Sequence, residues 1–133
     1  MVEFALVVPV FLLVLCGVLD FGFMLFSRMT VINAAREAAR AAVIVADTTT
    51  IPFLAPQTAQ SVAAGAGMGL TTAQTAVTCV AIKTSGSCSF ATKTSSQSGD
   101  AVKVTVTYPY KSFFPLLFGT TFNLSSTVQM VLE

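Results

Sequence analysis

The run from Phe4 to Phe26 constrains this chain most, because Asp20 is its only charged residue. The run is long enough to cross the hydrocarbon core of a bilayer, which takes about 20 residues of helix. A secretory signal peptide would have a shorter apolar core, a basic start and a small-residue cleavage site, and this stretch shows none of them. The sequence therefore predicts a membrane-spanning helix near the start of the chain.

That helix is predicted to continue well beyond the apolar run. The next stretch, TVINAAREAARAAVIVAD, is rich in alanine and favours helix throughout. We expect one helix over about residues 1–46, with a kink or loosened turn near Pro9, since proline lacks an amide donor. Asp47 and the three threonines after it are expected to end the helix.

A short second helix is predicted from Pro56, which suits a first helical position. Pro52 and Pro56 are expected to delay its start, and apolar residues recur behind them at helical spacing. Beyond Leu70 the apolar residues instead recur at every second position, around 77–82, 102–107 and 122–132. Three such stretches predict a small antiparallel sheet.

The predicted fold class is therefore α+β. A long hydrophobic helix, about residues 1–46, is followed by a short helix and a small antiparallel β-sheet head. By domain, residues 1–47 are expected to form a membrane or filament-core helix, and residues 48–133 a small β-rich head outside the cytoplasm. The segment YPYKSFFPLLFG in the head carries more apolar surface than one strand edge should expose. We expect it to cover the lower part of the long helix or to contact the head of a neighbouring molecule.

The composition argues against several classes of function. The 133-residue chain has no histidine, and therefore lacks the commonest general base and metal ligand. No Gly-rich phosphate loop or nucleophile–base pair is evident, so we expect no enzyme activity and no cofactor. The cysteines are too dispersed to suggest a metal site. A net charge of +1 gives no electrostatic footprint for nucleic acid.

Cys79 and Cys88 flank a predicted hairpin turn. A disulfide closing this loop would stabilise the fold by roughly 2.5–3 kcal/mol in the chain-entropy treatment. It would also indicate an oxidising compartment. The alternative is a pair of half-buried thiols in a cytosolic protein. Cys16, inside the apolar helix, is interpreted as a small packing residue.

The arginines and the predicted disulfide disagree about membrane orientation. Arg28, Arg36 and Arg40 follow the apolar run, so the positive-inside rule places the rest of the chain in the cytoplasm. The disulfide places it outside. Both hold together if the chain is made with a basic leader ahead of Met1, which we therefore expect. Arginine also suits partly buried ion pairs, which favours packing around this part of the helix.

Small residues recur along the predicted helix. Gly17 and Gly22 lie among large side chains, and six alanines lie between residues 34 and 42. Small residues let helix backbones approach closely, which is how helices associate in lipid. The alternative interpretation is that alanine is present simply because it favours helix. A lone membrane anchor has little need of a small-residue face.

Glu3 is energetically unfavourable at the start of an apolar helix, because an unpaired carboxylate in hydrocarbon costs several kcal/mol. One interpretation is an interfacial carboxylate favoured by the dipole at the helix N-terminus. The other is that Glu3 pairs with the α-amino group of another copy of the chain. Such pairing would favour helices stacked in one register.

The stretches VEFALVVPVFLLVLCGVLDFG and NAAREAARAAV resemble the TadE-like pilins of tight-adherence (Flp) systems, within the type IV pilin superfamily. The resemblance covers about the first 45 residues and returns in the C-terminal TTFNLSSTVQMVLE. It implies that Glu3 takes part in subunit recruitment. Residues matching the family pattern in the apolar segment, and implied to serve filament assembly, are Glu3, Phe4, Pro9, Gly17, Asp20 and Gly22. Those matching its helical continuation are Asn33, Ala34, Arg36, Glu37 and Arg40. Helix packing and ion pairs are expected of Arg28, Arg36, Glu37 and Arg40.

The resemblance implies a structural pilin that polymerises through its N-terminal helix into a helical filament of identical subunits. Its partners would be the inner membrane before assembly, a prepilin peptidase and the pilus assembly machinery. The subunit would start as an inner-membrane precursor and end in an extracellular pilus on the cell surface. Two alternatives stay open: a minor, initiating pilin, and a single-pass membrane protein with an extracytoplasmic binding module.

Overall fold

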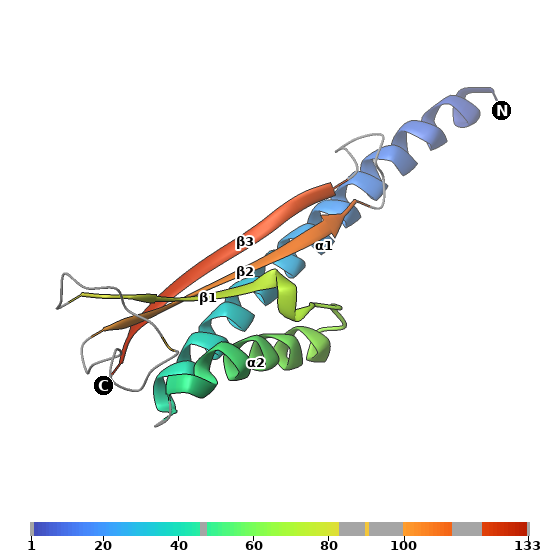
Figure 1. Ribbon diagram of the computed structural model, residues 1–133. Helices are drawn as coiled ribbons and strands as arrows, with labels where there is room; N and C mark the ends of the chain where they lie inside the picture. Colours follow the sequence, from blue (N-terminus) through green and yellow to red (C-terminus); the bar gives the residue numbers. More distant parts are fainter. Residues whose placement is uncertain (1, 46–47, 83–89, 91–99, 113–120, 133) are drawn as a thin grey trace.

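The computed structural model describes residues 2–45, 48–82, 90, 100–112 and 121–132. It has the predicted α+β architecture, with a long helix, a second helix and a three-stranded antiparallel sheet (Figure 1). The elements in chain order are α1 (Val2–Ile44), a 3-10 turn η1 (Thr48–Thr50), α2 (Ile51–Gly65), a 3-10 turn η2 (Thr72–Gln74), β1 (Thr75–Val80), β2 (Ala101–Lys111) and β3 (Thr121–Val131).

Helix α1 dominates the shape of the molecule. It runs without interruption through Pro9 and ends at Ile44, two residues before the predicted end. Its C-terminal half packs against α2 and the sheet, which together with it form the head. Its N-terminal part projects beyond the head (Figure 1). The long predicted helix is thus confirmed.

The predicted start of the second helix is wrong. Helix α2 begins at Ile51 and contains Pro56, rather than beginning at that proline. Pro52 lies in the first turn, where the missing amide has no intrahelical partner to lose. Pro56 does interrupt the hydrogen-bond ladder. Burial of one face of α2, including Ile51 and Ala55, offsets that cost.

The three strands pair in the order β1-β2-β3, and both pairings are antiparallel. Strand β3 pairs with β2 along its whole length, whereas β1 reaches only as far as the pair Thr75–Val106. Beyond Val106, β2 therefore lacks a neighbour on the β1 side among the described residues. This accounts for Pro109, because a proline is tolerated where no ladder hydrogen bond is needed on that side.

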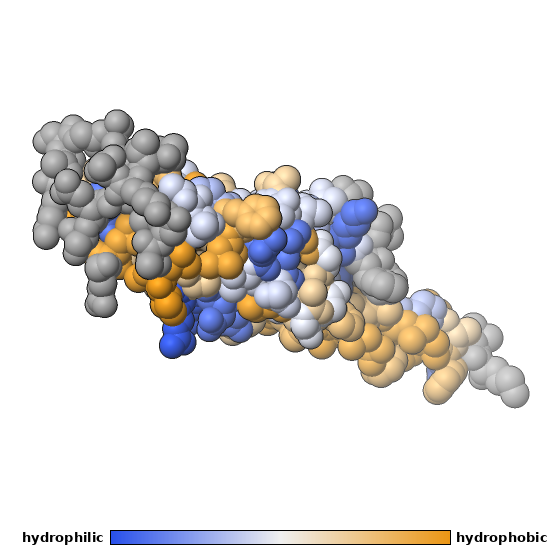
Figure 2. All heavy atoms as spheres, turned by 60° about the horizontal axis from the view of Figure 1, so that its bottom comes forward, coloured by the Kyte–Doolittle hydropathy of each residue, from blue (hydrophilic) through white to orange (hydrophobic). Residues whose placement is uncertain are grey.

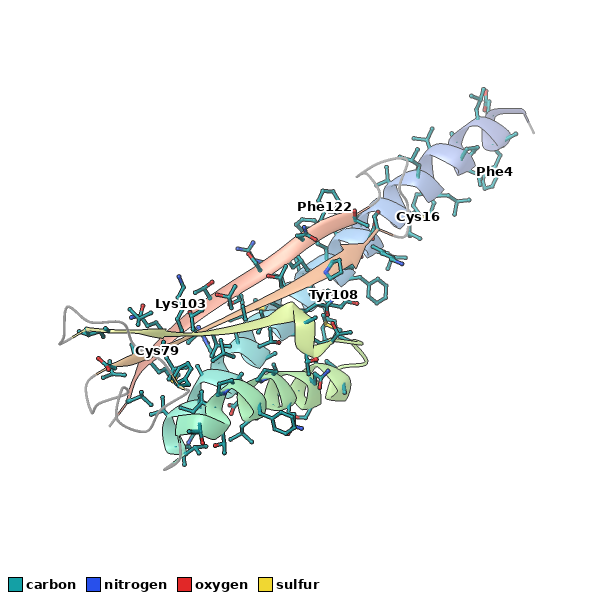
Figure 3. The ribbon with its side chains drawn as sticks, viewed as in Figure 1. Phe4, Cys16, Cys79, Lys103, Tyr108 and Phe122 are labelled. Atoms are coloured by element: carbon teal, nitrogen blue, oxygen red, sulfur yellow. The ribbon has the colours of Figure 1, made fainter. Side chains whose placement is uncertain are left out.

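The core of the head lies between the two helices and one face of the sheet. Small side chains allow the helices to approach closely, and β-branched residues of β2 cover them. The opposite face of the sheet is polar and includes the exposed Thr78 and Lys103, the latter labelled in Figure 3. The apolar residues with no exposed surface are Ala34, Ala35, Ala38, Ala39 and Ala42 from α1, Ile51, Ala55 and Ala59 from α2, and Ala101, Val102, Val104 and Val106 from β2.

This close packing predicts a sharp difference between two adjacent alanines of α2. Ala63 is 1% exposed, whereas Ala64 is exposed. Ala63→Leu should lower the free energy of unfolding by about 1–3 kcal/mol, because the added carbons overpack the core. Ala64→Leu should change it by less than about 0.5 kcal/mol. Denaturant unfolding in mild detergent measures both, and equal effects would contradict the packing described.

Candidate functional site

The most unusual side chain of α1 is Asp20, which is only 3% exposed in an otherwise apolar stretch. The Tyr110 hydroxyl donates a hydrogen bond to one carboxylate oxygen at 2.7 Å, and the Ser112 hydroxyl donates to the other at 2.5 Å. The Tyr110 hydroxyl also lies 3.3 Å from the Asp20 backbone carbonyl oxygen. We call these three residues the Asp20 clamp, because they join α1 to the end of β2.

The electrostatics of the clamp keep its donor protonated. Burial raises the pKa of Tyr110 to about 12, with further contributions from the hydrogen bond to Asp20, the charge of Asp20 and nearby Tyr108. The phenol therefore remains a hydrogen-bond donor throughout the physiological pH range. Beside the clamp, Phe21, Met24 and Phe122 line a mainly apolar cavity of about 240 Å³.

Among the described residues, the clamp is the hydrogen-bonded contact between the head and α1 that lies nearest the start of the helix. The part of the helix before it, Val2–Leu19, is about 27 Å long at a rise of 1.5 Å per residue. The hydrocarbon core of a bilayer is about 30 Å thick. Within the described residues, α1 is the one helix long and apolar enough to cross a membrane, judged by length and composition. The projecting part of α1 therefore has the dimensions of a membrane span.

Large apolar side chains cover this projecting part and lie outside the head. Figure 2 shows a mostly hydrophobic surface here, in contrast to the mixed surface of the head. Phe4 is labelled far out on the helix in Figure 3. The exposed large apolar residues before the clamp are Phe4, Leu6, Val7, Val10, Phe11, Leu12, Leu13, Val14, Leu15, Val18 and Leu19.

The exposed apolar surface does not end at the clamp. On the exposed side of α1, Phe23, Phe26 and Met29 are 61%, 53% and 64% exposed. We call the exposed apolar surface from Phe4 to Met29 the apolar strip. It is about 38 Å long at the helical rise, which is more than the thickness of the hydrocarbon core. Beyond it the same side becomes polar, with Asn33, Arg36, Glu37 and Arg40 exposed.

Two family models match the chain. A model described as TadE-like protein matches residues 1–40, which contain the apolar strip. A model described as Tad-like Flp pilus-assembly matches residues 30–127, about three quarters of the chain. The chain belongs to the Tad-like Flp pilus-assembly family. No curated protein and no solved structure matches it.

Membership in the Tad-like Flp pilus-assembly family gives the chain a role in Flp/Tad pilus assembly. It also confirms the resemblance to TadE-like proteins. The two matched regions overlap on α1, between residues 30 and 40. The first model thus covers most of α1, including its apolar N-terminal part. The second covers the end of α1 and most of the head that packs on it.

The structure separates the residues that the sequence grouped for assembly. Glu3, Phe4 and Pro9 are exposed on the projecting part, whereas Asp20 is buried in the clamp. Gly22 lies in a shallow groove between large side chains of the strip: Val18, Leu19, Phe23 and Phe26. Added methyl groups at Gly17 or Gly22 would meet no atom within 4 Å. The described fold of the subunit therefore does not require small residues there.

The remaining predicted site residues lie on the surface or outside the described ranges. Arg28, Arg36, Glu37 and Arg40 are exposed and form no ion pair with one another or with another described residue. Their pairing with another copy stays a prediction. Cys16 is half-buried and free. Cys79 lies in β1, but Cys88 lies outside the described residues, so their disulfide stays a prediction.

Sequence reasoning missed the partners of Asp20. The apolar positions of β2 were expected to end near Val106, but the strand continues to Lys111. Tyr108 and Tyr110 extend the same alternation that was recognised at the valines, so the signal was present in the sequence. Both tyrosines were instead grouped with the apolar segment YPYKSFFPLLFG, and a proline such as Pro109 argues against a strand interior. Most of the apolar segment that follows, residues 113–120, lies outside the described residues.

The clamp predicts different effects for two tyrosines on the same face of β2. Tyr110→Phe should lower the free energy of unfolding by about 1–3 kcal/mol, because a carboxylate loses a hydrogen-bond donor. Tyr108→Phe should cost less than about 0.5 kcal/mol, since its hydroxyl forms no hydrogen bond within the described residues. Denaturant unfolding in detergent measures both. Equal losses would show that the clamp does not stabilise the head.

The raised pKa of Tyr110, about 12, also predicts a pH dependence. The unfolded chain releases this proton near pH 10, while the folded chain holds it until about pH 12. The stability contributed by the protonated phenol is therefore complete below pH 10 and lost as pH rises towards 12. Unfolding curves at several pH values should show this loss in the parent and a smaller one in Tyr110→Phe. Identical pH profiles would contradict the assignment.

Proposed function

We propose that this chain is a structural pilin that polymerises through α1 into an Flp/Tad pilus filament. The observation that carries the proposal is the length of the apolar strip. It begins at Phe4 and continues to Met29, past the clamp at Asp20. A membrane anchor needs no exposed apolar residues beyond the bilayer.

The bilayer covers only part of the strip. With the clamp placed at the membrane surface, Phe23, Phe26 and Met29 lie beyond the span formed by Val2–Leu19. Burying a phenylalanine or methionine side chain contributes about 1.5–3 kcal/mol. Neighbouring copies of α1, packed side by side, would bury these residues together with the part that the membrane first held. Assembly then exchanges lipid contacts for helix–helix contacts.

The glycines support the same interface. Gly22 lies in a groove of the strip, and nothing in the described subunit occupies the space above it. Small residues on an exposed helix face allow a second helix to approach closely. Gly17 also has open space above it, but it lies five residues earlier and therefore about 140° away around the helix. In our proposal, one copy of α1 packs over Gly22 and a different copy packs over Gly17.

Glu3 then has a role that the isolated subunit does not show. Its side chain is exposed at the start of the projecting part. Once neighbouring helices surround it, an unpaired carboxylate would be costly. We assign its partner as the α-amino group of another copy, and this pairing would favour one axial register. The remaining steps of the proposal are a precursor in the inner membrane, cleavage by a prepilin peptidase and export by the pilus machinery to the cell surface, with no catalysis by the subunit.

The experiment is electron microscopy of the purified chain, comparing Gly22→Leu with a matched control. Gly22→Leu should not lower the free energy of unfolding, because an added Cβ meets open space at this exposed position and leucine favours helix more than glycine does. It should abolish fibres, because leucine blocks the approach of a second helix. Gly65→Leu, on α2 and away from the strip, should assemble like the parent.

Other outcomes separate the alternatives. Gly22→Leu subunits that form normal fibres would contradict the proposed interface. Parent subunits that enter fibres only beside another pilin would indicate a minor, initiating pilin. A parent chain that enters no fibre would favour the membrane-anchored binding module.

A further inference from the structure

Strand β3 forms an unusually open edge of the sheet. It spans Thr121–Val131 and pairs with β2 in an unbroken register along its whole length. No charged residue, proline or bulge interrupts it. Among the described residues, its other side makes no backbone hydrogen bond between those two ends. At about 3.4 Å per residue, the free edge is roughly 37 Å long.

Edges of this kind are normally protected. Proteins shorten their edge strands or place lysine, proline or a bulge on them, because unpaired amides and carbonyls invite another strand. Strand β3 has none of these features, although it is as long as β2 in the centre of the sheet. The other edge, β1, has the sequence TAVTCV and also lacks charge and proline.

We propose that the free edge of β3 pairs with β1 of a second copy of this chain, so that neighbouring heads form one continuous sheet. This inference rests on the proposed polymerisation through α1. Figure 1 shows β3 running alongside α1. A neighbour that packs on the helix is therefore brought close to the strand edge as well.

Strand direction selects β1 as the partner. Both β1 and β3 run antiparallel to β2, so they point the same way along the head. Copies in a polymerising array keep their α1 helices in one direction and are related without inversion. Under that condition β3 meets β1 of the next copy in parallel pairing. Pairing of β3 with another β3 in antiparallel fashion would point the two helices in opposite directions.

Such a contact is heterologous, because it joins two different surfaces of the same chain. Heterologous contacts that do not close into a ring extend into a helical array. The polar face of the sheet continues across the junction without opposing charges, because Thr78 on β1 and Ser125, Thr127 and Gln129 on β3 are all neutral. The six residues of β1 limit the length of the pairing.

A matched pair of lysine variants tests the edge. Thr105 on β2 and Thr127 on β3 lie opposite each other, with hydroxyl oxygens 3.0 Å apart. Thr105→Lys and Thr127→Lys remove the same hydrogen bond and add the same charge to the same face. Only Thr127→Lys places it on the edge, where lysine opposes strand addition. We expect the concentration needed for fibre formation to rise about tenfold more for Thr127→Lys, equivalent to about 1.4 kcal/mol.

Disulfide trapping tests the partner strand. Thr78→Cys is combined in turn with Ser125→Cys, Thr127→Cys or Gln129→Cys, and assembled fibres are oxidised. Thr78 and Gln129 of one molecule both face Lys103, so two strand spacings, about 9.6 Å, separate them. That distance exceeds the reach of a disulfide. We expect one combination to give a ladder of cross-linked oligomers, and each single variant to give none.

Three results would overturn the inference. Fibres that give no ladder with any combination, together with equal effects of the two lysine variants, would leave polymerisation intact and remove the strand pairing. Dimers from Thr127→Cys alone would indicate pairing of β3 with β3. If the parent chain forms no fibres, both the inference and the proposed function fail.

Discussion

The position of a single buried carboxylate determines where the projecting part of α1 meets the head. Asp20 lies in the apolar part of α1, where an unsatisfied charge would be costly in lipid. Hydroxyl groups at the end of β2 satisfy it, and they hold the head at one level along the helix. Within the described residues, the helix before that level is mostly apolar and exposed, and the helix after it has one side in the core of the head.

The two sides of α1 beyond the clamp differ in the size of their side chains. Towards α2 and the sheet the helix presents alanine, which permits close packing within the subunit. Away from them it presents large apolar residues as far as Met29 and polar residues beyond. The folded subunit thus buries one side of the helix and leaves the other side exposed. Lipid can cover the apolar surface of the projecting part, and neighbouring helices can cover the whole apolar strip.

Local patterns were sufficient to predict most of the fold. The apolar run and the alanine-rich stretch predicted α1, and the period of two predicted three strands. The start of α2 was wrong because Pro52 was interpreted as a barrier, although a proline in a first turn loses no intrahelical hydrogen bond. The alternation of β2 could have been followed through Tyr110, but the contact of Tyr110 with Asp20, 90 residues away in sequence, is not encoded by any local pattern. The interface around Gly22 depends on a second copy, which the fold of one chain does not contain.

The most direct test of the account is water exposure of the strip beyond the clamp, before and after assembly. Single cysteines in place of Phe23, Phe26 and Met29, in a Cys16→Ala background, would be reacted with a membrane-impermeant thiol reagent. A cysteine in place of Phe11 would serve as the lipid-embedded control. The account predicts labelling of the three sites in vesicles, no labelling at Phe11, and protection of all four in fibres. Protection of the three sites already in vesicles, or unchanged labelling in fibres, would contradict it.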